Sequence, residues 1–140
     1  MLSFWKRLRV DTPWVTKLLQ WPEADVRKVT GRAVVTACRG DVVKAAGDAR
    51  EMLRELPGFG QGTALASALL TAAAPARLAV YDKRARSGLQ MVELELTEDA
   101  PRFYARYMTL IEQCRAEGAD VGNRWSARDV DLALWILGGK

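Results

Sequence analysis

The chain has 140 residues, 49% of them hydrophobic, and carries 21 basic against 17 acidic side chains, a net charge of +4. This length and apolar content indicate one compact domain, 1–140, and argue against disorder. The chain contains no histidine, which excludes Ser-His-Asp and Cys-His catalysis as well as histidine-ligated metal sites.

Three helices are predicted in the first part of the chain, at about 12–20, 23–38 and 41–55. The first has a proline in its opening turn, a favoured position, and ends before Trp21-Pro22. The other two place apolar residues at steps of three or four, which is typical of helices with one buried face.

The segment 56–64 reads Leu-Pro-Gly-Phe-Gly-Gln-Gly-Thr-Ala, and a further helix is predicted at 63–74. Glycine allows a tight turn and a close approach of the backbone to a partner. The free N–H groups of the turn and of the helix start would face the same way, with the positive end of a helix dipole behind them. DNA phosphate is the obvious anion for such donors. The candidate backbone-binding residues are Gly58, Gly60, Gln61, Gly62 and Thr63, and Phe59 is expected to pack inward.

An extended link, Leu78-Ala79-Val80, follows and delivers Asp82 to the start of a predicted helix at about 83–90. Aspartate is a strong helix N-cap, so the ordinary interpretation of Asp82 is a cap. Residues 91–96 alternate in polarity, but the chain offers no strand to pair with them, and we expect a loop.

Two more helices complete the prediction, one at 100–117 and one that opens at a capping box at Ser126 and runs to Leu137. The whole chain is therefore expected to form an all-α, compact helical domain of about six to seven helices. No apolar run is long enough for a membrane helix, and the first residues lack the features of a secretory signal. We therefore expect a cytoplasmic protein that does not act in a membrane.

The charge is unevenly distributed. Residues 1–90 carry 15 basic and 8 acidic side chains, a net of +7, whereas residues 91–140 carry 6 and 9, a net of −3. The basic part contains the glycine-rich turn, which favours a polyanionic partner. Lys83 and Arg84, next to Asp82, are further candidate phosphate contacts.

The run 56–64, followed by Leu78-Ala79-Val80-Tyr81-Asp82, resembles the core of the helix-hairpin-helix DNA glycosylase superfamily, and the match covers about residues 41–90. The resemblance implies an all-helical fold, a hairpin that grips the DNA backbone, and Asp82 as the catalytic carboxylate. Members with lyase activity carry a Schiff-base lysine where this chain has Gly62. The expected reaction is therefore monofunctional hydrolysis of a base–sugar N-glycosidic bond, without strand cleavage.

Such a reaction passes through an oxocarbenium-like state, which a carboxylate can stabilise while it orients water. A base flipped out of the duplex needs an aromatic platform, for which Tyr81 and Trp14 are candidates. No cofactor or metal is expected, since the four-cysteine cluster of some glycosylases is missing. Both cysteines, Cys38 and Cys114, are predicted to be buried free thiols on apolar helix faces.

Two alternatives stay open at this point. The chain could be a non-enzymatic helix-hairpin-helix module that binds DNA without turnover, or a helical interaction protein in which the hairpin only turns the chain. The sequence does not name the base that an enzyme of this kind would remove.

Overall fold

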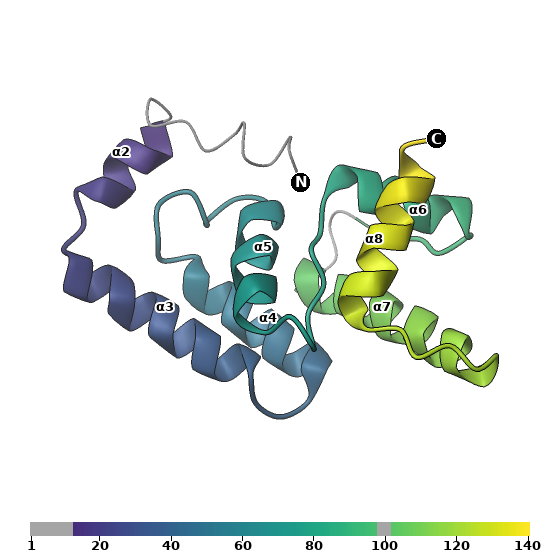
Figure 1. Ribbon diagram of the computed structural model, residues 1–140. Helices are drawn as coiled ribbons and strands as arrows, with labels where there is room; N and C mark the ends of the chain where they lie inside the picture. The colour runs from purple at the N-terminus through teal and green to yellow at the C-terminus, as the bar shows by residue number, and fades with distance from the viewer. Residues whose placement is uncertain (1–12, 98–101) are drawn as a thin grey trace.

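The computed structural model describes residues 13–97 and 102–140, which form helices and connecting segments (Figure 1). No strand occurs in these two ranges. The all-α prediction of six to seven helices is confirmed, because the described residues contain α2 (Pro13–Leu19), α3 (Glu23–Ala37), α4 (Val42–Leu53), α5 (Ala64–Ala73), α6 (Lys83–Met91), α7 (Phe103–Asp120) and α8 (Ala127–Gly138).

Three helix starts are fixed by local capping bonds. The carboxylates of Asp41 and Asp82 each accept a hydrogen bond from the backbone N–H three residues later, at 2.9 Å and 2.7 Å. At the start of α8, the Ser126 hydroxyl accepts from the Asp129 N–H at 3.1 Å and the Asp129 carboxylate accepts from the Ser126 N–H at 2.8 Å. The predicted capping box is confirmed, and it satisfies two backbone donors at once.

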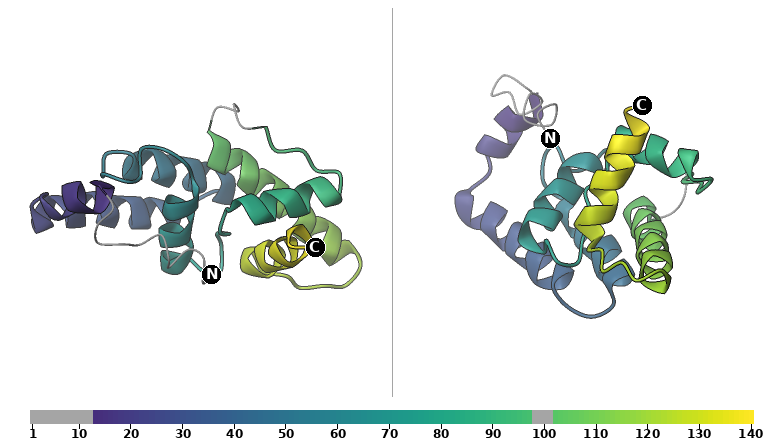
Figure 2. Two further views of the ribbon diagram at one scale, coloured as in Figure 1. Left: turned by 90° about the horizontal axis from the view of Figure 1, so that it is seen from above. Right: turned by 45° about the vertical axis from the view of Figure 1, so that its right-hand side comes forward.

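The helices gather in two groups. Figure 1 and the left view of Figure 2 show α2–α5 on one side and α6–α8 on the other, with the chain that follows α5 running between them. In the first group α3 and α4 pack together and α5 packs on both, while in the second α6 packs on α8. The contact of α4 with α7 joins the two groups.

The predicted apolar faces of α3 and α4 pack against the core, although Val26, Val29 and Val42 on them are only half-buried. Ala33 and Ala37 on α3 are inaccessible to solvent, as are Ala46, Ala49 and Leu53 on α4. Burial of these faces is the main stabilising term for helices that would be marginal in isolation.

The axes of α6 and α8 approach closely because glycine stands at the contact. A Cβ atom at Gly88 would overlap the backbone of Leu134, and one at Gly138 would overlap the backbone of Arg84. The absence of a side chain at both positions thus lets the helix that begins at Asp82 lie directly on α8.

The last part of the chain follows the prediction with shifted bounds. Residues 92–97 form no helix or strand, as expected for the alternating segment. The predicted helix 100–117 is seen as Phe103–Asp120, and its expected first two residues lie outside the described ranges. No helix in the described ranges has both the length and the apolar character to cross a membrane.

The prediction for Cys38 is wrong, because this residue is exposed. It is the C-cap residue of α3 and lies three residues after Val35, which is also exposed, so it stands on a different side of the helix from the buried Ala33 and Ala37. Cys114 is half-buried in α7, and burial raises the pKa of its thiol.

Candidate functional site

A cleft of about 1220 Å³ opens between the two groups of helices, and among the helices of the described ranges each one except α3 contributes to its walls. Eight of the ten predicted site residues line it, and they come from separate segments: Trp14, Gln61, Gly62, Thr63, Tyr81, Asp82, Lys83 and Arg84. Gly58 and Gly60 do not line it. We call residues 56–63 the hairpin and residues 78–82 the link. The fold therefore brings the last residues of the hairpin and the last residues of the link to one cavity.

The hairpin is held by two arginines, Arg50 in α4 and Arg54 at the C-cap of that helix. Arg50 donates to the carbonyl oxygens of Phe59 at 2.8 Å and Gly62 at 2.5 Å, and it is buried, with 4% of its surface exposed. Arg54 donates to the Gly60 oxygen at 3.2 Å. Both arginines also line the cleft. Sequence reasoning missed them, although their spacing of four residues places them on one face of a helix that leads into the turn.

These carbonyl bonds set the direction of the hairpin's donors. In a planar trans peptide group the C=O and the following N–H point in opposite directions, and no peptide bond in the described chain is cis. The N–H groups of Gly60, Gln61 and Thr63 therefore point away from the arginines of α4. From Gly60 to Ala66, the seven backbone N–H groups donate to no atom in the described residues. An ordinary helix start leaves about four such donors.

The first glycine of the hairpin has a packing role. Gly58 has φ +88°, and a Cβ atom there would overlap the ring of Trp14 in α2. Trp14 thus covers Gly58 and closes one wall of the cleft. Phe59 is buried, as predicted, with 7% of its surface exposed. Gly62 also has a positive φ, +69°, with open space around it.

The carbonyl groups of the link are held by tyrosines of α7. The hydroxyl of Tyr104 donates to the Ala79 oxygen, and that of Tyr107 donates to the Val80 oxygen, both at 2.8 Å. Both tyrosines are buried, and burial raises their pKa values, so the hydroxyls keep their protons and act as donors. Their separation by three residues places them side by side on one face of α7.

The N–H groups of the link are held from two other helices. The Val80 N–H donates to Oδ2 of Asp131 in α8 at 2.7 Å, and the Tyr81 N–H donates to Oγ of Ser67 in α5 at 2.9 Å. An extended segment with no neighbouring strand must satisfy its backbone groups in another way. Here side chains from α5, α7 and α8 take the place of a strand, and they fix the segment that ends at Asp82.

Asp82 itself has one oxygen bonded and one free of bonds to the described chain. Oδ1 accepts from the Ala85 N–H at 2.7 Å, and no hydrogen bond reaches Oδ2 from the described residues. The residue is half-buried and lines the cleft. This geometry orients the carboxylate while leaving an oxygen for a ligand.

A second carboxylate, Asp131, lies behind the link. Only 2% of it is exposed, and its Oδ1 accepts from Nη1 of Arg128 at 2.6 Å. Burial raises the pKa of Asp131 to about 6, against the lowering effects of the Val80 N–H and Arg128. Sequence reasoning missed this residue. The sequence did contain a sign of it: Asp131 is an acidic residue, next to Val130, on a face of α8 that is otherwise apolar.

Aromatic side chains form much of the remaining surroundings. The ring of Tyr81 meets Phe103 and Tyr107 edge to face, with centroids 4.9 Å and 5.3 Å away, and 9% of Tyr81 is exposed. Phe103 and Trp135, which were not predicted as site residues, also line the cleft. The Arg84 guanidinium lies over the Trp135 ring, 3.5 Å from its centroid, whereas Lys83 is exposed.

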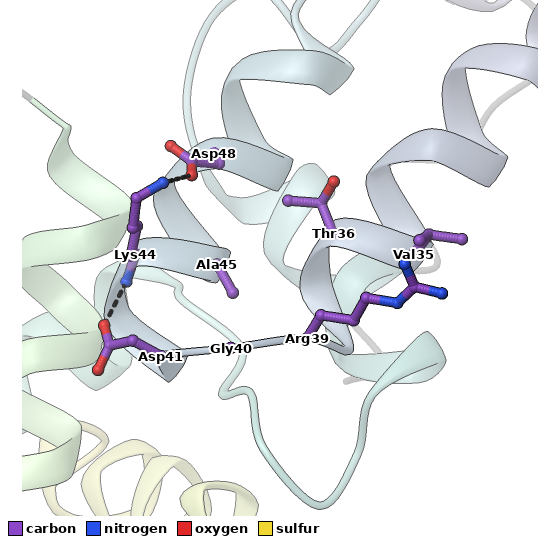
Figure 3. A pocket seen from close by; sticks show the side chains of 8 residues that line it. All are labelled: Val35, Thr36, Arg39, Gly40, Asp41, Lys44, Ala45 and Asp48. Atoms are coloured by element: carbon purple, nitrogen blue, oxygen red, sulfur yellow. Dashed lines mark hydrogen bonds and ion pairs between the residues drawn. The ribbon is translucent and has the colours of Figure 1, made fainter.

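A second hollow of about 340 Å³ lies where α3 turns into α4 (Figure 3). Two of the charged groups that line it are paired with each other: Nζ of Lys44 contacts Asp48 at 2.6 Å, and Arg102 contacts the other oxygen of Asp48 at 2.6 Å. These cations lower the pKa of Asp48. The carboxylate of Asp41 is used as the cap of α4. This hollow therefore leaves fewer polar groups available to a ligand than the cleft does.

Comparisons with protein-family models, with curated proteins and with solved structures found no match to this chain. Functional assignment thus depends on the geometry of the cleft. Within the described ranges, no three Cys, Asp or Glu side chains converge as a metal site requires.

Proposed function

We propose that this protein binds DNA and hydrolyses a base–sugar N-glycosidic bond, with Asp82 as the catalytic carboxylate. One observation carries the proposal: the hairpin end, whose backbone N–H groups have no acceptor among the described residues, and the carboxylate of Asp82 line the same cleft. A group that can hold a phosphate and a group that can stabilise a sugar cation are thereby available to one bound molecule.

The DNA backbone would be held by the hairpin. The N–H groups of Gly60, Gln61 and Thr63 supply donors, and the glycines at 58 and 62 supply the turn that presents them. Lys83 is exposed beside Asp82 and adds a mobile positive charge. Arg84 is stacked on Trp135, so its contribution is a fixed charge at the wall of the cleft.

The flipped nucleotide would enter between the two groups of helices. Aromatic and aliphatic side chains, among them Trp14, Phe103 and Trp135, give the base an apolar surface to stack on. The ionised Asp82 stabilises positive charge on the sugar and orients the water that attacks the anomeric carbon. The base leaves with its bonding electron pair and acquires a proton, and an abasic site remains.

A binding module without turnover is the second candidate, and two contacts favour it. The carboxylate of Asp82 already serves as a cap, and Tyr81 is enclosed by neighbouring rings with 9% exposed. This candidate keeps the hairpin contacts and predicts DNA binding that weakens with salt, because each neutralised phosphate releases counterions.

The test incubates the protein with duplexes carrying a panel of damaged or modified bases, followed by hot alkali to reveal abasic sites. Asp82→Asn is the informative variant, since asparagine caps a helix as well as aspartate does and only the charge is lost. We expect base release to fall by at least about 100-fold.

Asp41→Asn is the matched control, because Asp41 caps α4 in the same way outside the cleft. Base release that is equal in wild type and Asp82→Asn would refute the catalytic role. Salt-sensitive binding without base release would favour the binding module, and absence of both would leave the hairpin as a turn.

A further inference from the structure

We propose that Asp131 is a positioning residue for Asp82, acting through the backbone of Val80, with Arg128 as its counter-charge. This inference rests on the proposed role of Asp82. It assigns a function to a buried acid that neither touches the cleft nor belongs to the sequence motif.

The three residues form a continuous path from α8 to the link. Nη1 of Arg128 contacts Oδ1 of Asp131 at 2.6 Å, and Oδ2 of Asp131 accepts from the Val80 N–H at 2.7 Å. Asp82 follows two residues later, at the first turn of α6. Arg128 lines the cleft, whereas Asp131 is 2% exposed.

Burial excludes a direct catalytic role for Asp131. Both of its oxygens are engaged, one by Arg128 and one by Val80, and a ligand in the cleft meets Arg128 first. A general acid or base must reach the proton it transfers. Asp131 therefore acts on the reaction only through the groups it holds.

An acid is an expensive choice for this position. A buried carboxylate costs free energy even when it is paired, and a neutral side chain could also accept the Val80 N–H. What the carboxylate adds is a charge that fixes Arg128 at the cleft wall and the link at the same time. The other partners of the link, Ser67, Tyr104 and Tyr107, carry no charge at neutral pH.

The groups that face Asp131 come from three helices. Arg128 lies on its own helix, Asp82 stands at the start of α6, and Tyr104 and Tyr107 belong to α7. Arg128 is the cation among them, and Asp82 is a like charge. The ionisation of Asp131 is thus felt both by the Val80 N–H and by Asp82.

Asp131→Asn tests the proposal, because it keeps an acceptor for the Val80 N–H and removes the charge. Asp129→Asn is the matched control: the same substitution in the same helix, at an exposed position where asparagine can still bond to the Ser126 N–H. The measurements are an NMR titration of the Val80 amide proton, together with kcat and KM for base release.

In wild type we expect the Val80 amide shift to inflect near the pKa of Asp131, about 6, and to lose this step in Asp131→Asn but not in Asp129→Asn. Loss of positioning should lower kcat by about 10-fold to 100-fold with KM nearly unchanged. An unchanged kcat in Asp131→Asn, or a wild-type Val80 amide without an inflection, would overturn the proposal.

Two further results keep the inference separate from the proposed activity. If wild type releases no base, the proposed function fails. Loss of the Val80 inflection in Asp131→Asn, but not in Asp129→Asn, would then still support the conclusion that Asp131 holds the link. If Asp131→Asn does not fold, Arg128→Gln replaces it. Removing the counter-charge should move the Val80 inflection to higher pH, and an inflection that stays in place would refute the path.

Discussion

The hairpin and the link border the same cleft but satisfy their backbone groups in opposite ways. In the hairpin, two arginines of a single helix hold three carbonyl groups, and the N–H groups are left without acceptors in the described chain. In the link, four side chains from three helices hold both carbonyl and N–H groups.

This difference fits the two proposed roles, ligand binding for the hairpin and positioning of Asp82 for the link. Free donors on a turn can meet an anionic ligand, and the arginines behind the turn keep it in shape without using those donors. The link, whose N–H and C=O groups at Val80 are both bonded to buried side chains, offers a ligand less of its backbone, but it holds its last residue, Asp82, in a fixed place. Preorganised groups of this kind are what a catalytic site requires.

The largest expected effect comes from removing the support of the hairpin. Arg50→Met leaves the carbonyl groups of buried Phe59 and exposed Gly62 without their donor, and we expect the free energy of unfolding to fall by about 3 to 4 kcal/mol, most of it for the Phe59 carbonyl. Urea denaturation measures this. Arg54→Ala is the control, because Arg54 is exposed and makes one longer hydrogen bond to the hairpin, at 3.2 Å, besides an exposed ion pair with Glu51. A change below about 1 kcal/mol in Arg50→Met would show that the hairpin keeps its shape unaided.

The next effect concerns pH and the link. Burial raises the folded-state pKa of Asp131 from 3.8 to about 6, so the folded protein binds this proton more tightly than the unfolded chain does. This tighter proton binding stabilises the fold fully below about pH 4, and the stabilisation is lost as the pH rises to about 6. The free energy of unfolding changes by about 3 kcal/mol over that range. The measurement is the difference in unfolding free energy between wild type and Asp131→Asn at each pH, and a constant difference would contradict it.

A smaller effect is expected for a single neutral bond of the link. Tyr107→Phe removes the donor to the Val80 oxygen and leaves a carbonyl unpaired, at a cost of about 1.5 kcal/mol. Tyr104→Phe, which releases the Ala79 oxygen instead, should cost a similar amount. Thermal unfolding of the two variants measures this cost. If neither variant is less stable than wild type, water can replace the tyrosine hydroxyls as donors.

The smallest effect on stability, and the sharpest test of the hairpin as a binding surface, is expected for Gly60→Ala. Gly60 has no positive φ, and the nearest atom to an added Cβ is the Arg54 oxygen at 3.8 Å. We expect stability within about 0.5 kcal/mol of wild type and DNA affinity about tenfold weaker, since the methyl group keeps phosphate from the N–H.

The control for that variant is Gly31→Ala in α3, where an added Cβ meets nothing within 4 Å. Equal DNA affinity in the two glycine variants, measured at one salt concentration, would show that the backbone at Gly60 does not approach phosphate.

The sequence by itself determined the local structure. The caps at Asp41, Asp82 and Ser126 bond to groups three residues away, and glycines with positive φ stand where the turn needs them. Such features depend on neighbours along the chain, so residue types at fixed spacing are enough to predict them. For this reason the helices, the hairpin and the loop after α6 could be predicted from the sequence.

Only the tertiary structure decided how the cleft is supported. Val80 and Asp131 are 51 residues apart, and Tyr104 is 25 residues from Ala79. The backbone of the link requires partners wherever it lies, but the packing of α5, α7 and α8 selects which side chains supply them. The same dependence explains the exposed Cys38, since packing decides which side of α3 is buried: Cys38 lies on the side of the exposed Val35, not on that of Ala33 and Ala37.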